Sequence, residues 1–227
     1  MPKIAVVQDI LSANDEIARE NRRRFDQAGV FVLNLMSAPG AGKTSLVLRT
    51  IAALQPELRL GVVEGDVASQ VDAERVAETG VPVVQINTGG GCHLEAHALR
   101  AALEKIPLEN LDLLLIENVG NLICPAAFPL GEHLQVVIAS LPEGDDKPLK
   151  YPALFAQADA VVINKIDLAP YMDFDREAFR RRVEGLNPRV TFFEISCRTG
   201  EGLAAWADWL RRRRAEQRES ARRIGGC

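Results

Sequence analysis

Seven short apolar runs alternate with amphipathic stretches along this chain, and this alternation constrains the fold more than any other feature. The runs are rich in Val, Leu and Ile, as expected for strands that are buried on both faces of a sheet. They cover residues 31–36, 60–63, 81–86, 111–116, 134–139, 160–163 and 190–195. Helical patterns lie between most of them, at 43–54, 71–78, 94–103, 174–186 and 203–214. The pattern predicts an α/β fold, with a doubly wound, mostly parallel sheet of about seven strands flanked by helices.

The chain has 227 residues, which suits one domain of this type with a sizeable core. Residues 1–30 are expected to form an N-terminal helical extension, with a strand-like start at 4–7 and a helix capped by Asn14. Residues 215–227 are expected to be a mobile tail. The formal net charge of -4 argues against nucleic-acid binding, so the arginine run at 211–214 is interpreted as a solvated helix end. Since neither a membrane-spanning run nor a signal-peptide layout is found, a cytoplasmic protein is expected.

A glycine-containing loop lies between the first apolar run and the helical pattern that begins at Lys43. Its glycines allow backbone N–H groups to turn toward phosphate oxygens, and the helix N-terminus adds a favourable dipole. In such a loop the lysine reaches the β- and γ-phosphates and the threonine hydroxyl binds Mg²⁺. The segment is predicted to be the phosphate loop of a P-loop NTPase, with a serine where the first glycine usually stands. The nucleotide-binding residues expected here are Ser37, Gly40, Ala41, Gly42, Lys43, Thr44 and Ser45.

Two later runs end in segments that are typical of guanine recognition. The first is Asn164-Lys165-Ile166-Asp167, and the second is Ser196-Cys197-Arg198-Thr199-Gly200. A carboxylate at Asp167 can accept hydrogen bonds from N1 and the exocyclic amine of guanine, a donor pattern that adenine lacks. In this order after a phosphate loop, the two segments predict a GTP-binding protein. The residues expected to contact the base or hold its loops are Asn164, Lys165, Asp167, Ser196 and Cys197.

Acidic residues at two other strand ends are candidates for Mg²⁺, which prefers carboxylates and water as ligands. Asp66 closes the segment Glu64-Gly65-Asp66, and Glu117 opens the segment Glu117-Asn118-Val119-Gly120-Asn121. We expect Thr44, Asp66 and Glu117 to hold Mg²⁺ or its waters. Asp66 is also open to interpretation as a helix cap or turn residue. The expected catalytic residues are Lys43, Thr44, Asp66 and Glu117, and the lack of an obvious water-positioning glutamine predicts slow GTP hydrolysis.

Two cysteines and one histidine are predicted to lie near the same edge of the sheet. Cys92 and His93 stand at the start of a predicted helix, and Cys124 follows the Glu117 segment closely. Thiolates and imidazole suit Zn²⁺ and Ni²⁺. Three ligands are one short of a closed tetrahedral site, which two chains can complete across a symmetry axis. From the residues alone, a small buried cysteine and a helix-capping histidine stay equally open. His97, Cys197 and Cys227 are not expected to be principal ligands.

Taken together, these motifs resemble the HypB family of hydrogenase nickel-incorporation GTPases. The resemblance runs from about residue 9 to about residue 209. Its most specific part is the pair Gly91-Cys92-His93-Leu94 and Asn121-Leu122-Ile123-Cys124-Pro125. The resemblance implies a homodimer that forms with GTP and supports nickel delivery to the large subunit of nickel–iron hydrogenase, together with a nickel accessory protein.

The resemblance also implies site residues. Cys92, His93 and Cys124 would hold nickel or zinc at the dimer interface. Residues 145–150 would lie near the dimer partner, where Lys147 or Lys150 can reach the opposite nucleotide. The sequence departs from some family members because it has no Cys-x-x-Cys-Gly-Cys segment and no histidine-rich stretch. The interface site is therefore expected to be the only substantial metal site.

Two alternatives stay open. One is a related GTPase that serves another metalloenzyme, of the urease or cobalamin type. Urease accessory GTPases carry Cys-Pro-His, whereas Ala126 follows Cys124-Pro125 here, which favours the hydrogenase branch. The other is a low-turnover, nucleotide-binding dimer with a structural zinc.

Overall fold

The computed structural model describes residues 2–67 and 69–225. Within these residues, one sheet of seven strands has the order β3-β2-β4-β1-β5-β6-β7, and every neighbouring pair is parallel. The strands are β1 (Phe31–Ser37), β2 (Leu60–Asp66), β3 (Val83–Asn87), β4 (Leu113–Glu117), β5 (Leu134–Ser140), β6 (Ala160–Asn164) and β7 (Thr191–Glu194). The helices are α1 (Pro2–Ala28), α2 (Lys43–Leu54), α3 (Val71–Ala77), α4 (Ala96–Leu103), α5 (Lys147–Lys150), α6 (Pro152–Gln157), α7 (Arg176–Leu186) and α8 (Leu203–Gly225). The predicted fold class is confirmed.

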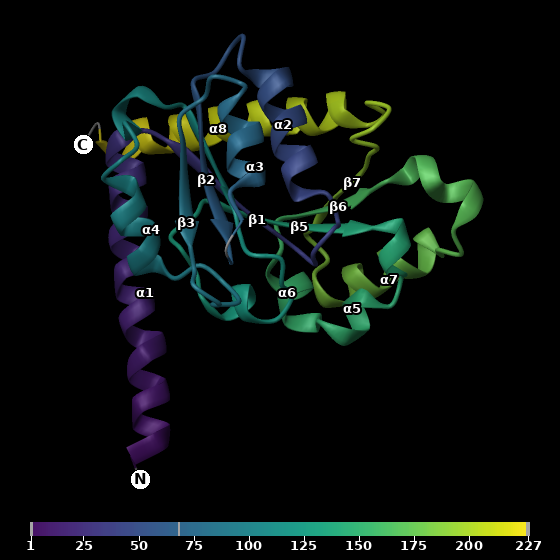
Figure 1. Ribbon diagram of the computed structural model, residues 1–227, viewed down its shortest axis with the longest axis horizontal. Coiled ribbons are helices and arrows are strands. Elements are labelled where there is room, and N and C mark those ends of the chain that lie inside the picture. The colour runs from purple at the N-terminus through teal and green to yellow at the C-terminus, as the bar shows by residue number, and fades with distance from the viewer. Residues whose placement is uncertain (1, 68, 226–227) are drawn as a thin grey trace.

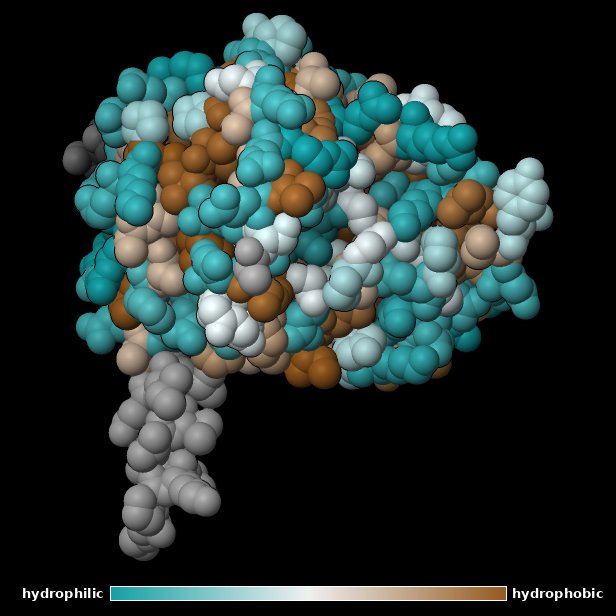
Figure 2. Space-filling view, viewed as in Figure 1, coloured by the Kyte–Doolittle hydropathy of each residue, from teal (hydrophilic) through white to brown (hydrophobic). Residues whose placement is uncertain are grey.

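Helices cover both faces of the sheet, with α2, α3 and α8 on one side and α5, α6 and α7 on the other (Figure 1). Successive strand side chains point to opposite faces. On β1, Leu33 and Leu35 therefore pack with α2 and α8, whereas Val32 packs with α1 and α4. Both faces are buried, which explains the near-continuous apolar runs. The outer surface in the same view is largely hydrophilic, with apolar residues gathered over α3 and the neighbouring strands (Figure 2).

A continuous helix, α1, replaces the strand-like start that was predicted at residues 4–7. Asn14 therefore lies inside this helix, and the prediction that it caps the helix is wrong. Its side chain instead accepts a hydrogen bond from the Ala96 N–H at 2.9 Å and donates one to the Pro129 carbonyl at 2.9 Å. Asn14 thus caps the first turn of α4, a long-range role that a local sequence pattern does not reveal.

The last helix, α8, continues to Gly225, so residues 215–225 of the predicted mobile tail are helical. Cys227 lies outside the described residues. The arginine run is used within the chain: Arg211 pairs with Glu57 at 2.9 Å, and Arg214 pairs with Asp112. Because α8 does not end at this run, and Arg214 is mostly buried beside Asp112, the prediction of a solvated helix end is wrong. No described helix has the length and apolar character needed to span a membrane.

Candidate nucleotide and metal site

The predicted phosphate loop connects the end of β1 to the start of α2. Gly42 stands just before α2 with a φ of 102°, in the left-handed region that favours glycine. A Cβ atom there would also collide with the Asn164 side chain. The Lys43 ammonium donates to the Ser37 hydroxyl at 3.1 Å. Ser37, which replaces the usual glycine, therefore holds the lysine beside the loop.

Asn164 joins the phosphate loop to both predicted base-reading segments. Its amide donates to the Ala41 carbonyl at 2.9 Å, and its Oδ1 accepts from the N–H groups of Lys165 at 2.8 Å and Cys197 at 3.2 Å. Lys165 has a φ of 62° and donates from Nζ to the Gly40 carbonyl at 2.7 Å. The three segments of the predicted nucleotide site are therefore close together, as the sequence predicted.

The carboxylate of Asp167 is oriented by Ser196, whose hydroxyl donates to Oδ1 at 2.6 Å. The Cys197 side chain is buried, and burial raises the pKa of its thiol to about 11. A protonated, buried thiol is a poor metal ligand. These segments therefore offer a carboxylate and a backbone N–H to the predicted nucleotide site, but no thiolate.

Two buried carboxyl groups, Glu64 and Glu117, face each other behind the phosphate loop. The register of β2 and β4 pairs these two residues directly. The Thr44 hydroxyl donates to Glu117 Oε1 at 2.8 Å. Neither Glu64 Oε2 nor Glu117 Oε2 has a hydrogen-bond partner among the described residues. Burial, followed by the nearby Glu117, raises the pKa of Glu64 to about 10; burial also raises the pKa of Glu117, which Lys43 opposes.

These atoms fit a bound Mg²⁺. Buried polar atoms without partners are costly, and a threonine hydroxyl beside two carboxyls offers the hard oxygen ligands that Mg²⁺ prefers. Glu64, Asp66 and Glu117 all line a cavity of about 480 Å³ together with the phosphate loop and Gly120. Glu64 was not among the residues predicted to hold Mg²⁺. An acid within the otherwise apolar run of β2 was the signal that could have revealed it.

The predicted metal ligands Cys92, His93 and Cys124 form a cluster beside this cavity. Their ligand atoms all lie within 4.8 Å of one another. Cys92 Sγ is 2.8 Å from Cys124 Sγ and 3.6 Å from His93 Nδ1. Burial lowers the pKa of His93, which favours the neutral imidazole that binds metals. Because Cys92 is exposed, the cluster is open to ions from solvent.

The other candidate ligands do not join this cluster. His93 precedes α4, which begins at Ala96 instead of at the predicted residue 94, so His97 is not one helical turn further along the same helix. The His97 ring instead contacts the Glu95 carboxylate at 3.1 Å and is exposed. Among the described residues, this is the one group of three or more cysteine, histidine, aspartate or glutamate side chains whose ligand atoms lie this close together. Its donor set of two thiols and an imidazole suits nickel or zinc.

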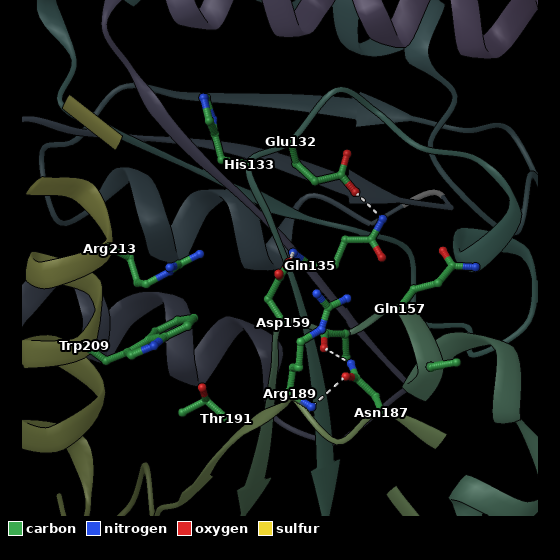
Figure 3. A pocket seen from close by; sticks show the side chains of 12 residues that line it. Glu132, His133, Gln135, Gln157, Asp159, Asn187, Arg189, Thr191, Trp209 and Arg213 are labelled. Atoms are coloured by element: carbon green, nitrogen blue, oxygen red, sulfur yellow. Dashed lines mark hydrogen bonds between the residues drawn. The ribbon is translucent and has the colours of Figure 1, made fainter. Parts of the chain in front are cut away.

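A larger cavity, of about 750 Å³, lies at the opposite edge of the sheet, where β5, β6 and β7 begin. Trp209 and Arg213 of α8 form one side of it, and Glu132 contacts Gln135 across from them (Figure 3). Glu132 accepts hydrogen bonds at both oxygens: Oε1 from Asn34 at 3.1 Å and Gln135 at 3.0 Å, and Oε2 from the Leu130 N–H at 2.8 Å. None of the predicted site residues lines this cavity.

Comparisons with known proteins identify the family to which the chain belongs. Residues 31–194 match the family model "CobW/HypB/UreG, nucleotide-binding domain". The hydrogenase maturation factor HypB of Rhizobium leguminosarum bv. viciae is 52% identical over 207 residues, which cover 91% of this chain and 69% of the relative.

Solved structures give the same result. The structure of HypB from Helicobacter pylori in complex with nickel is 39% identical with a TM-score of 0.86, and covers 90% of this chain and 96% of that one. HypB from Archaeoglobus fulgidus is 42% identical with a TM-score of 0.84, and covers 89% of this chain and 99% of that one. The chain therefore belongs to the CobW/HypB/UreG family, within its branch of HypB hydrogenase maturation factors.

Proposed function

We propose that this chain is a GTP-hydrolysing metallochaperone that dimerises with GTP and supports nickel insertion into nickel–iron hydrogenase. The observation that carries the proposal is the closeness of two sites on one segment. Glu117 ends β4 in the nucleotide cavity, and Cys124 follows a few residues later in the metal cluster. Nickel is the proposed cargo because the cluster suits it and because a related HypB has been solved with nickel.

In the proposed nucleotide step, Lys43 and the backbone of the phosphate loop bind the β- and γ-phosphates, and Asp167 selects guanine. Mg²⁺, held by Thr44, Glu117 and the acids at the end of β2, would neutralise the charge that develops on the phosphate oxygens. The Lys43 ammonium lies 3.1 Å from the Ser37 hydroxyl, at the loop where the phosphates are proposed to bind. Slow turnover is part of the proposal.

In the proposed metal step, two copies of the chain meet at Cys92, His93 and Cys124. Three ligands per chain leave the site incomplete until a second chain approaches. Ile123, next to Cys124, has a relative exposure of 67%, and Leu149 on α5 has 64%. Large exposed apolar side chains are typical of interaction surfaces. Lys150 pairs with Asp146 in its own chain, so Lys147 is the better candidate for contacting the partner's nucleotide.

The proposed partners are the large subunit of the hydrogenase and a nickel accessory protein, in the cytoplasm. The names of the relatives support this choice, because they are hydrogenase maturation factors. A urease or cobalamin client is the alternative within the same family. A structural zinc that neither exchanges nor responds to nucleotide would favour the low-turnover dimer instead.

The experiment compares Cys124→Ala with Cys197→Ala in Ni²⁺ binding by equilibrium dialysis and in GTP hydrolysis. Cys124→Ala is expected to weaken Ni²⁺ binding by about 10-fold or more and to leave measurable GTP hydrolysis. Cys197→Ala is expected to leave Ni²⁺ affinity unchanged, because its thiol is buried and protonated. Intact Ni²⁺ binding in Cys124→Ala, or its loss in Cys197→Ala, would refute the proposed metal site. Equal hydrolysis of GTP and ATP would refute the proposed nucleotide.

A further inference from the structure

Leu94, the residue after His93, is held between the two acid-bearing strand ends of the nucleotide cavity. It is fully buried. Its N–H donates to Asn118 Oδ1 at 3.0 Å, and Asn118 directly follows Glu117. Its side chain lies over Gly65, which separates Glu64 from Asp66, and a Cβ atom on Gly65 would be 2.8 Å from three Leu94 atoms. Leu94, which follows the metal ligand His93, therefore contacts β2 at Gly65 and the residue just after β4, Asn118.

Asn118 links two loops through a single oxygen atom. Its Oδ1 also accepts from the Val119 N–H at 2.9 Å, just before Gly120 of the nucleotide cavity. Its amide donates to Asn34 Oδ1 at 3.2 Å, and the side chains of both asparagines are fully buried. A buried N–H that loses its acceptor finds no water to replace it, so the Leu94 backbone must follow Asn118 if Asn118 moves.

The rest of the metal loop is tied to the same strand ends. The Thr88 N–H donates to the Asp66 carbonyl at 2.9 Å, and the Thr88 hydroxyl donates to the Gly91 carbonyl at 2.8 Å. On the other side, the Asn121 amide donates to the Cys92 carbonyl at 3.1 Å. Packed interiors shift between discrete arrangements instead of deforming gradually. A movement of either strand end is therefore transmitted to the backbone that carries Cys92 and His93.

We propose that Leu94 and Asn118 couple the nucleotide site to the metal cluster, with Asn118 as a positioning residue that sets nickel affinity according to the bound nucleotide. The inference rests on the proposed function, since it names the residues through which the nucleotide regulates the metal. A purely structural role for Asn118 would change stability but not the ratio of nickel affinities in the two nucleotide states. That ratio is therefore the quantity to measure.

The test measures Ni²⁺ affinity of the full chain with GDP and with a non-hydrolysable GTP analogue, each with Mg²⁺. In the unmodified protein the two affinities are expected to differ by about fivefold or more. In Asn118→Ala the ratio is expected to fall to within about twofold of one. Because the coupling is reciprocal, Ni²⁺ should change the relative affinity for the two nucleotides by the same factor in the unmodified protein. In Asn118→Ala this effect of Ni²⁺ should be lost as well.

The matched control is Thr50→Val. The Thr50 hydroxyl is buried and accepts from Trp206 Nε1 at 2.9 Å, outside both proposed sites. Its loss also leaves a buried N–H without an acceptor, so the cost to stability is of the same kind. Thr50→Val is expected to keep the ratio of the unmodified protein.

A second pair of variants avoids the loss of a hydrogen bond. Gly65→Ala places a methyl group against Leu94, whereas Gly61→Ala in the same strand places one 2.6 Å from Leu111. Both overpack the core, but only Gly65→Ala displaces the metal loop. Gly65→Ala is expected to change the ratio by about threefold or more, and Gly61→Ala to leave it unchanged. This pair decides the question if Asn118→Ala does not fold.

The outcomes separate this inference from the proposed function. If the unmodified protein shows the dependence on nucleotide and both Asn118→Ala and Gly65→Ala keep it, the coupling residues are wrong while the proposed function stands. If the control variants lose the ratio as fully as the test variants, the effect is general destabilisation and the inference is wrong. If the unmodified protein shows no dependence, nucleotide-regulated nickel binding fails and this inference fails with it.

Discussion

At the carboxyl edge of the sheet, Glu64 and Glu117 each keep a buried carboxyl oxygen that has no hydrogen-bond partner among the described residues. At the amino edge, the buried Glu132 has partners at both oxygens. The amino-edge cavity is nevertheless the larger, at about 750 Å³ against about 480 Å³. Volume alone therefore points away from the edge where the nucleotide site is proposed. A buried carboxyl group without a hydrogen-bond partner lowers the stability of the fold unless a ligand binds to it. Such groups are therefore a better guide to the functional site than cavity volume.

The largest change in GTP turnover is expected from Glu117→Gln, which changes one acid at the carboxyl edge. The amide keeps an oxygen for Thr44 but removes a charge that a metal ion needs. The kcat/KM for GTP is expected to fall by about 100-fold or more, a size typical of lost charge stabilisation in the transition state. Unfolding without Mg²⁺ or nucleotide should cost no less free energy than before, because burial opposes the ionised form. Steady-state kinetics and urea titration check both points; near-normal turnover would contradict the assignment.

At the amino edge, His133 is expected to make the free energy of unfolding depend on pH. Its Nδ1 accepts from the Val32 N–H at 3.1 Å, so the folded ring is neutral. Burial, assisted by Arg22, lowers its pKa from 6.5 to about 4. Because the unfolded state binds the proton more tightly, this contribution to stability is complete above pH 6.5 and is lost as the pH falls toward 4. The expected loss is about 3 kcal/mol.

Urea unfolding across this pH range measures the effect. In His133→Gln the free energy of unfolding should depend less steeply on pH, because glutamine does not titrate. An equally steep dependence in the variant would show that other groups are responsible.

Guanine selectivity offers a matched pair of aspartates. Asp167→Ala removes the carboxylate that is expected to accept from guanine. GTP affinity is expected to fall by about 1.5–3 kcal/mol, while ATP affinity stays as low as before. Asp159→Ala at the amino edge, where the carboxylate accepts from the Gln135 N–H at 2.8 Å, should leave GTP affinity unchanged. Competition binding with labelled GDP distinguishes the two. A similar loss in both variants would mean that stability, and not base recognition, is being measured.

The smallest effect is expected from Glu132→Gln, the same chemical change as in Glu117→Gln but at the amino edge. In the glutamine variant an NH₂ group replaces one carboxylate oxygen and faces an N–H donor that it cannot accept from. The free energy of unfolding is therefore expected to fall by about 1.5 kcal/mol. GTP turnover per folded molecule is expected to stay within about twofold. If Glu132→Gln were more stable than the unmodified protein, the Glu132 carboxylate would not be satisfied by its partners, and the proposed difference between the two edges would be wrong.

The phosphate loop and the base-reading segments could be predicted because their chemistry lies in short, continuous stretches. Cys92, His93 and Cys124 could be brought to one edge because parallel strands place their carboxyl ends together. Glu64 was not selected because its importance depends on the register between β2 and β4, which a single strand does not reveal. Asn14 was misassigned for a similar reason, since its partners lie on α4 and at Pro129, far away in the sequence.

A Ni²⁺ titration of the unmodified protein and of Cys92→Ala, each with GDP and with a non-hydrolysable GTP analogue, decides whether nucleotide and metal act together at the carboxyl edge. If the carboxyl edge combines nucleotide and metal chemistry, Ni²⁺ affinity changes by about fivefold or more between the nucleotides, and Cys92→Ala abolishes tight binding in both. Equal Ni²⁺ affinity in the two nucleotide states, or tight binding that survives in Cys92→Ala, would contradict the account.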